Sequence, residues 1–176
     1  MLGPREDRVV WSDHHMLLAC TCATRSPDPN TQVGACLVDK KNRILGTGYN
    51  AWPRGICSSG LPWDRNGDPF DVKYAYVVHA EKNAIFNALG PVDGATLYVT
   101  MYPCNECAKD IIQAGVSKII YLDNPYESLW QTRAAKRMFE MLDIPVRKHE
   151  WYQDPQTILE KIGARFSVPS SSSGKA

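Results

Sequence analysis

The chain has 176 residues, of which 44% are hydrophobic and 22% charged, and a formal net charge of +1 from 20 basic and 19 acidic residues. These values are ordinary for a globular protein of one domain, and they argue against the basic surface that grips a long nucleic acid. No run of 18 apolar residues is present, so we expect neither a membrane span nor a membrane partner.

Both ends of the chain are expected to be extensions of a central domain. Residues 1–11 are charged and contain no apolar segment of the kind that a secretory signal needs. Without such a signal, the six cysteines are interpreted as reduced thiols of a cytoplasmic protein. Residues 151–176 form the second extension, and its serine-rich end from Val168 has too few apolar residues to fold.

Residues 12–150 are predicted to form the domain itself. Its first element is a helix over 12–24, with Ser12 as the N-cap, and two closely spaced prolines end it. Strands are then predicted over 33–38 and 44–49, and the short polar segment between them makes a hairpin.

A long irregular loop is expected over 51–74, because this segment is rich in proline and glycine. Loops of this length inside a compact domain are usually functional or disordered. Beyond the loop, helices over 79–89, 104–114 and 129–142 alternate with strands over 95–100, 118–122 and 144–147. Single helices between strands favour parallel pairing with right-handed crossovers. The predicted fold is therefore α/β: a three-layer αβα sandwich on a five-stranded mixed sheet, with the hairpin first and parallel strands after.

The segments His79-Ala80-Glu81 and Pro103-Cys104-Asn105-Glu106-Cys107 carry the clearest chemical signal. One imidazole and two thiolates hold a zinc ion with three protein ligands, and the missing fourth ligand leaves the position for water that a catalytic zinc site keeps. Pro103 is expected in the first turn of a helix, which places Cys104 and Cys107 one turn apart on one face. We predict one catalytic Zn²⁺ held by His79, Cys104 and Cys107.

Glu81 is the predicted catalytic residue. Zinc-dependent base deaminases combine this ligand set with a glutamate that is not a ligand and that transfers protons. Burial beside the zinc would raise its pKa towards the working pH. Glu106 is the competing carboxylate, but on a helix it points away from the two cysteines, so we expect it to face outward or to cap the helix. The alternative interpretations are a structural zinc knuckle or two unrelated core cysteines.

Other cysteines and histidines are expected to be structural. Cys20 and Cys22 diverge on a helix, which favours core packing over a second metal site. His14 and His15 could join Cys20 or Cys57 in such a site, but no spacing enforces it. We therefore expect both histidines at the surface.

Four segments resemble the deoxycytidylate deaminase family of the cytidine deaminase-like superfamily: residues 28–35, 48–55, 79–85 and 103–115. They follow the family's order, and the resemblance covers about residues 12–150. It implies an αβα fold, one catalytic zinc and conversion of dCMP to dUMP and ammonia, which supplies dUMP for dTMP synthesis. It also implies a homo-oligomer, often a hexamer, which in many members is activated by dCTP and inhibited by dTTP. If a nucleotide triphosphate binds, Mg²⁺ is expected to accompany it.

The same resemblance implies substrate contacts. Asn50 would bind the deoxyribose, Ala80 would offer backbone groups to the base, and Tyr121 would stack near it. Arg25 or Lys73 would meet the 5′-phosphate. From the residues alone, a simple turn residue is the weaker alternative for Asn50, whereas a core residue of a strand is an equal alternative for Tyr121.

The resemblance further implies an effector site formed by Tyr49, Asn50, Arg54 and Gly55. Loop packing and solvent exposure are the alternatives for Tyr49 and Arg54. The chain departs from the family at Ala51-Trp52, where glycine and a smaller apolar residue are usual. Trp52 therefore bears on regulation and on the choice between mono- and triphosphate.

Three other functions compete with dCMP deamination. The nearest is deamination of dCTP, or of both nucleotides. A nucleic-acid-editing deaminase would need a basic groove with stacking aromatics, which the near-neutral charge disfavours. A non-enzymatic nucleotide-binding module with a vestigial zinc fold is disfavoured because Glu81 is present.

Overall fold

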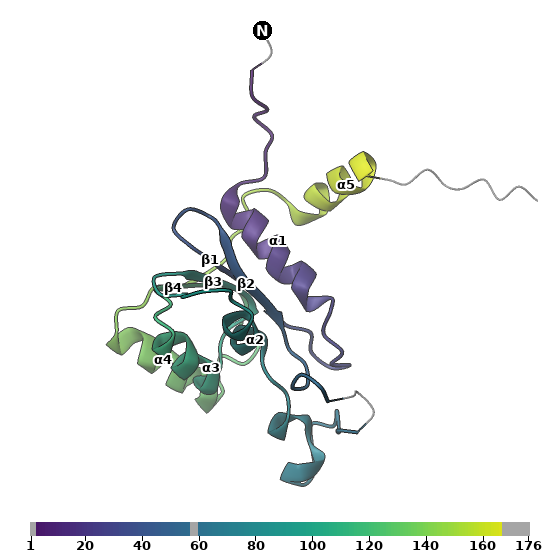
Figure 1. The fold of residues 1–176 in the computed structure, drawn as a ribbon, viewed down its shortest axis with the longest axis vertical. Helices are drawn as coiled ribbons and strands as arrows, with labels where there is room; N and C mark the ends of the chain where they lie inside the picture. Colours follow the sequence, from purple (N-terminus) through teal and green to yellow (C-terminus); the bar gives the residue numbers. More distant parts are fainter. Residues whose placement is uncertain (1–2, 57–59, 167–176) are drawn as a thin grey trace, which may run out of the picture.

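The structure is a computed structural model that describes residues 3–56 and 60–166. Its strands form one sheet in the order β2-β1-β3-β4-β5. They are β1 (Gly34–Val38), β2 (Ile44–Tyr49), β3 (Thr96–Met101), β4 (Lys118–Asp123) and β5 (Val146–Lys148). β1 pairs antiparallel with both β2 and β3, whereas β3, β4 and β5 are parallel. The predicted five-stranded mixed sheet is confirmed (Figure 1).

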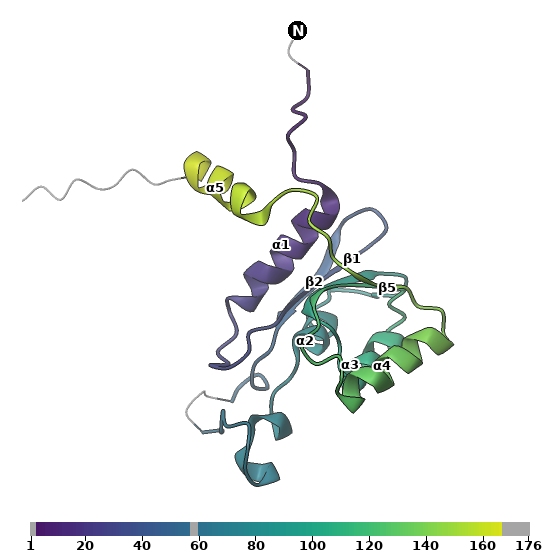
Figure 2. The same cartoon turned by 180° about the vertical axis from the view of Figure 1, so that it is seen from behind.

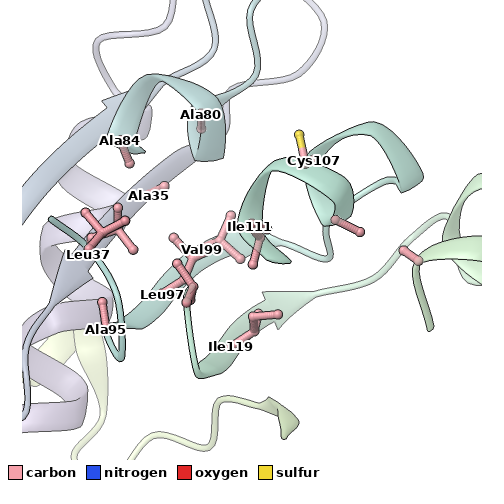
Figure 3. Close-up of a cluster of buried hydrophobic side chains, with 14 of the residues drawn as sticks. Ala35, Leu37, Ala80, Ala84, Ala95, Leu97, Val99, Cys107, Ile111 and Ile119 are labelled. Atoms are coloured by element: carbon pink, nitrogen blue, oxygen red, sulfur yellow. The ribbon is translucent and has the colours of Figure 1, made fainter. Parts of the chain in front are cut away.

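Helices cover both faces of the sheet, as Figures 1 and 2 show. They are α1 (Trp11–Ala23) on one face, and α2 (Ala80–Phe86), α3 (Asn105–Gln113) and α4 (Trp130–Met141) on the other. Successive side chains of β1 point to opposite faces of the sheet, so they pack alternately in the two cores. Cys36 and Val38 pack with Met16 of α1, while Ala35 and Leu37 pack in the opposite core (Figure 3). The predicted three-layer αβα sandwich is therefore confirmed.

The start of α1 differs from the prediction. The helix begins at Trp11, and Val10 occupies the N-cap position without a side-chain hydrogen bond, so Ser12 is not the cap. A tertiary contact fixes this end instead. The buried Asp13 carboxylate accepts hydrogen bonds from the backbone N–H groups of Tyr152 and Gln153.

The C-terminal helix α5 (Pro155–Phe166) was not predicted. Asp154, the residue before α5, caps this helix. Its carboxylate accepts hydrogen bonds from the Thr157 backbone N–H at 2.7 Å and from the Thr157 hydroxyl at 2.9 Å. An Asp-Pro pair is a recognisable helix start that would have found this element. α5 lies beside the start of α1 in both views (Figures 1 and 2). The expected disorder from Val168 falls outside the described residues.

The predicted loop over 51–74 is irregular in its described part, apart from two short 3-10 helices, η1 (Pro69–Asp71) and η2 (Lys73–Ala75). It extends away from the sheet below α2 in Figure 1. Within the described ranges, no helix combines the length and apolar character needed to cross a membrane.

Two glycines bring α2 directly onto the backbone of β2. A Cβ atom at Gly48 would lie 2.3 Å from the carbonyl oxygen of Ala80 and 2.3 Å from the backbone nitrogen of Ala84. A Cβ atom at Gly46 would meet the same helix one turn later, 2.3 Å from the Ala84 carbonyl oxygen. These contacts place the first turn of α2, where Glu81 lies, directly on the sheet.

Gly48→Ala is expected to lower the free energy of unfolding by about 1–3 kcal/mol, because the added methyl group overpacks the contact between α2 and β2. Activity should fall as well, since the displaced turn carries Glu81. Urea denaturation and steady-state rates measure the two effects. Gly90→Ala is the control, because a Cβ atom there meets nothing within 4 Å. A Gly48→Ala protein as stable as the Gly90→Ala protein would contradict this packing.

Candidate active site

The three predicted metal ligands lie together where two helices begin. His79 is the N-cap of α2, Cys104 is the N-cap of α3, and Cys107 lies in the first turn of α3. The Nδ1 atom of His79 is 3.3 Å from the Cys107 Sγ and 3.5 Å from the Cys104 Sγ. Pro103 was expected inside the helix but precedes the N-cap, because Cys104 still has extended backbone angles.

This geometry fits a zinc ion. A tetrahedral zinc with bonds of about 2.3 Å to sulfur and about 2.1 Å to nitrogen separates the two ligand atoms by roughly 3.6 Å. The observed nitrogen–sulfur distances of 3.3 and 3.5 Å are close to that value. Among the described residues, no fourth histidine, cysteine or carboxylate joins the group. Three ligands leave a coordination position open to water, which is the arrangement of a catalytic zinc site.

The pKa values of the Cys104 and Cys107 thiols are shifted in opposite directions. A hydrogen bond from Cys107, helped by His79, lowers the pKa of Cys104 to about 4. The same hydrogen bond, together with burial, raises the pKa of Cys107. The hydrogen bond to Cys104 also raises the pKa of His79. One thiolate therefore forms readily, whereas loss of the second proton needs the positive charge of a metal.

Glu81 lies in the first turn of α2 with only 4% of its surface exposed. Burial is the main cause that raises its pKa above the usual value for glutamate, which suits a group that must both take and give a proton. Glu106 is exposed as expected, and it forms an ion pair with Lys109 at 2.6 Å. The two carboxylates of the motif therefore differ in their surroundings, since Glu81 is buried and Glu106 is exposed to solvent.

A cleft of about 500 Å³ contains His79, Glu81 and Cys104. Of the predicted substrate contacts, Asn50, Ala80 and Lys73 also line it, whereas Tyr121 and Arg25 do not. Tyr121 packs edge to face on Tyr102, with ring centroids 4.9 Å apart, and it is Tyr102 that reaches the cleft. Arg25 is exposed outside it.

Lining residues that the sequence analysis missed include Arg65, Tyr74, Tyr102, Tyr126 and Trp130. Tyr102 directly precedes the cysteine motif, so its place at the end of β3 was a usable signal. The others come from irregular segments or a helix start, where no periodic pattern marks the residue that faces a site.

Asn50 belongs to a buried polar network beside the cleft. Its Oδ1 accepts from the Val33 backbone N–H at 2.8 Å, and its Nδ2 donates to the Thr31 carbonyl at 2.9 Å and to Asp28 Oδ2 at 3.3 Å. Asp28 Oδ2 also lies 2.5 Å from Lys73 Nζ, and both side chains are buried. The network ties the long loop to the end of the hairpin.

Lys73→Met is expected to lower the free energy of unfolding by about 3–5 kcal/mol, because it leaves the Asp28 carboxylate buried without its cation. Adding Asp28→Asn to this variant should restore part of the loss, since no unpaired charge then remains. Chemical denaturation of the two single variants and the double variant measures the coupling. Additive losses would show that the two side chains do not depend on each other.

Comparison with known proteins identifies the family. Residues 9–123 match the family described as "Cytidine and deoxycytidylate deaminase zinc-binding region", and this span contains all three metal ligands and Glu81. The chain belongs to this family. Human deoxycytidylate deaminase is 44% identical over 146 residues, which are 82% of each chain. A probable deoxycytidylate deaminase of Drosophila melanogaster is 43% identical over 152 residues, 82% of this chain and 75% of that one.

A solved structure agrees with these relatives. The dCMP deaminase from the cyanophage S-TIM5, in complex with dCMP and dUMP, superposes on this deaminase with a TM-score of 0.61 and 28% identity. The match covers 78% of this chain and 95% of the phage protein. A tRNA:A34 deaminase shares the fold, with a TM-score of 0.53 at 22% identity.

The predicted effector segment of the deaminase runs from the end of β2 into the start of the long loop. Arg54 donates a hydrogen bond to the Asn87 side chain. Gly55 adopts a left-handed φ of 87°, which favours glycine. Trp52 is buried and stacks on Trp63 with ring centroids 3.8 Å apart. The tryptophan therefore fills this space with an aromatic pair, and the effector role of the segment stays a prediction.

None of the other described cysteines and histidines joins a group that could hold a metal ion. Cys20 packs against the buried cluster around Met16 as predicted, and Cys22 is half-buried. His14 is exposed as expected, but the prediction for His15 is wrong. His15 is fully buried, with its ring 5.6 Å from that of Trp11 and 5.1 Å from that of Tyr98. α1 lies flat on the sheet and turns this residue inward, which its sequence pattern did not show; Cys57 lies outside the described residues.

Proposed function

We propose that the chain catalyses the hydrolytic deamination of dCMP to dUMP and ammonia, and so supplies dUMP for dTMP synthesis. The observation that carries this proposal is the group of His79, Cys104 and Cys107, of which His79 and Cys104 line one cleft with the buried Glu81. The relatives named as deoxycytidylate deaminases support the choice of substrate. The phage neighbour, which was solved with dCMP and dUMP, supports it independently.

The chemistry divides between a metal and a proton carrier. A zinc ion held by the three ligands supplies a Lewis acid that lowers the pKa of a bound water to about 7. Glu81 takes a proton from the attacking water as the new C–O bond forms at the amino-bearing carbon of the base. It delivers this proton to the ring nitrogen. Glu81 then carries the second proton of the same water, which is still on the attacking oxygen, to the amino group, so that ammonia leaves as the C–N bond breaks and the C=O bond forms. The raised pKa of Glu81 suits both directions of transfer.

Contacts to the rest of the nucleotide are proposed from the cleft lining. Asn50 and Ala80 keep the roles that the family resemblance implies, at the deoxyribose and the base. Tyr102 takes the stacking role that was expected of Tyr121, because its ring reaches the cleft. Burial of the base against an aromatic ring stabilises the complex by roughly 1–3 kcal/mol.

One activity panel tests the proposal. Zinc-loaded protein is incubated with dCMP, dCTP, CMP and deoxycytidine, each with and without dCTP or dTTP as effector, and the loss of cytosine absorbance is followed. We expect the highest kcat/KM for dCMP. A higher value for dCTP would favour the triphosphate alternative, and no turnover of any deoxycytidine nucleotide would overturn the proposal.

We further propose a cytoplasmic homo-oligomer, with a hexamer favoured, that dCTP activates and dTTP inhibits, with Mg²⁺ accompanying a bound triphosphate. Free thiols at the five cysteines within the described ranges support a reducing compartment. The exposed apolar side chains of Phe86 and Leu89 support self-association. Sedimentation with and without dCTP measures the assembly and its response to the effector.

A further inference from the structure

The charged side chains that line the cleft are almost all compensated or assigned. Asp28 and Lys73 neutralise each other at 2.5 Å. Glu106 pairs with Lys109, and Glu81 is the buried proton carrier. Arg65 is different: within the described ranges, no carboxylate lies within ion-pair distance of its guanidinium. The cleft therefore holds one cation whose charge no neighbouring side chain cancels.

Two tyrosines hold this guanidinium across the cleft. Arg65 Nε donates to the Tyr74 hydroxyl at 3.1 Å, and its Nη2 lies 3.5 Å from the Tyr126 hydroxyl. Tyr74 belongs to the long loop and Tyr126 to the connection between β4 and α4, and both line the cleft. A guanidinium has five N–H donors, so these two contacts orient Arg65 and leave other donors available to a ligand.

The position of Arg65 suits one end of a nucleotide. Of the residues that line the cleft, Glu81 is buried, whereas Arg65 and Tyr74 are exposed, so the cleft runs from a buried reactive end to a basic rim. A nucleotide has the matching polarity, with a base to be buried and a phosphate dianion that tolerates partial solvation. The planar guanidinium binds phosphate oxygens in pairs, which makes arginine the usual partner for this group.

We propose that Arg65, oriented by Tyr74 and Tyr126, binds the 5′-phosphate and sets the preference for a nucleotide over a nucleoside. This inference rests on the proposed dCMP deaminase function. The two cations that the family resemblance suggested are less suited to the role. Arg25 does not line the cleft, and the Lys73 ammonium is already paired with Asp28.

Arg65→Gln tests the proposal through substrate preference. We expect kcat/KM for dCMP to fall about 10- to 100-fold, mainly through KM, because one or two charged hydrogen bonds are lost. The value for deoxycytidine, which has no phosphate, should stay within about 3-fold of wild type. Arg65→Lys should restore part of the preference. Calorimetric titration of the same proteins with dUMP and with deoxyuridine provides a second readout that does not depend on turnover.

Arg43→Gln is the matched control, because Arg43 lies at the turn of the hairpin, at the opposite end from the cleft-lining Val33 and Asn50. An equal loss on dCMP and deoxycytidine in Arg65→Gln would overturn the inference, as would loss of preference in Arg25→Gln with Arg65→Gln unaffected. These outcomes are distinct from failure of the proposed function, in which the wild-type protein itself would not turn over dCMP.

Discussion

Replacing Glu81 by glutamine is expected to lower kcat for dCMP by about 10²- to 10⁴-fold while the protein still binds one zinc ion per chain. Glutamine has nearly the same shape, so the first turn of α2 can keep its packing on β2. It cannot take a proton from water or deliver one to the base, and the reaction needs both steps. Steady-state rates and elemental analysis of the same preparation measure the two quantities together.

Glu106→Gln is the matched control for this experiment. Glu106 lies in the same cleft and carries the same charge, but it is exposed and paired with Lys109 rather than buried beside the metal ligands. We expect its kcat to stay within about 3-fold of wild type, because only a surface ion pair is lost. If Glu106→Gln abolished activity and Glu81→Gln retained it, the assignment of the proton carrier would be reversed.

The metal ligands could be predicted from the sequence because short-range rules locate them. Cys104 and Cys107 are separated by one helical turn, and both His79 and Cys104 occupy helix starts, which local residue patterns indicate. The proximity of His79 to the two cysteines depends instead on the order of the strands in the sheet. The connection from β2 through α2 to β3 passes over β1, which pairs with both strands. Spacing alone does not state this strand order.

The rim of the cleft could not be predicted in the same way. Arg65, Tyr74 and Tyr126 come from irregular segments, and only the folded chain shows that their side chains meet. The burial of His15 could not be predicted from helical periodicity either. The sheet against which α1 packs decides which side of that helix is buried. Local patterns therefore predicted the reacting groups, whereas the groups proposed to select the substrate depend on long-range contacts.

Cys107→Ala is expected to remove the zinc ion and with it activity, with a loss of more than about 10⁴-fold, since both proposed catalytic roles act on a water at the metal. Two remaining ligands, His79 and Cys104, bind zinc too weakly to retain it through purification. Thermal stability should fall too, because metal affinity that is absent in the unfolded chain contributes to folding free energy. A zinc chelator added to the wild-type protein should reproduce both effects.

Cys36→Ala is the control for Cys107→Ala, because it distinguishes the loss of a metal ligand from the loss of a buried side chain. Cys36 and Cys107 are both fully buried, so each substitution removes one sulfur atom from a packed core. Cys36 packs in the cluster around Met16 on the α1 side of the sheet, and it is not part of the group of His79, Cys104 and Cys107. We expect Cys36→Ala to lose stability by about 1–2 kcal/mol and to keep its zinc content and kcat. Equal zinc loss in both variants would mean that core packing, rather than coordination by Cys107, retains the ion.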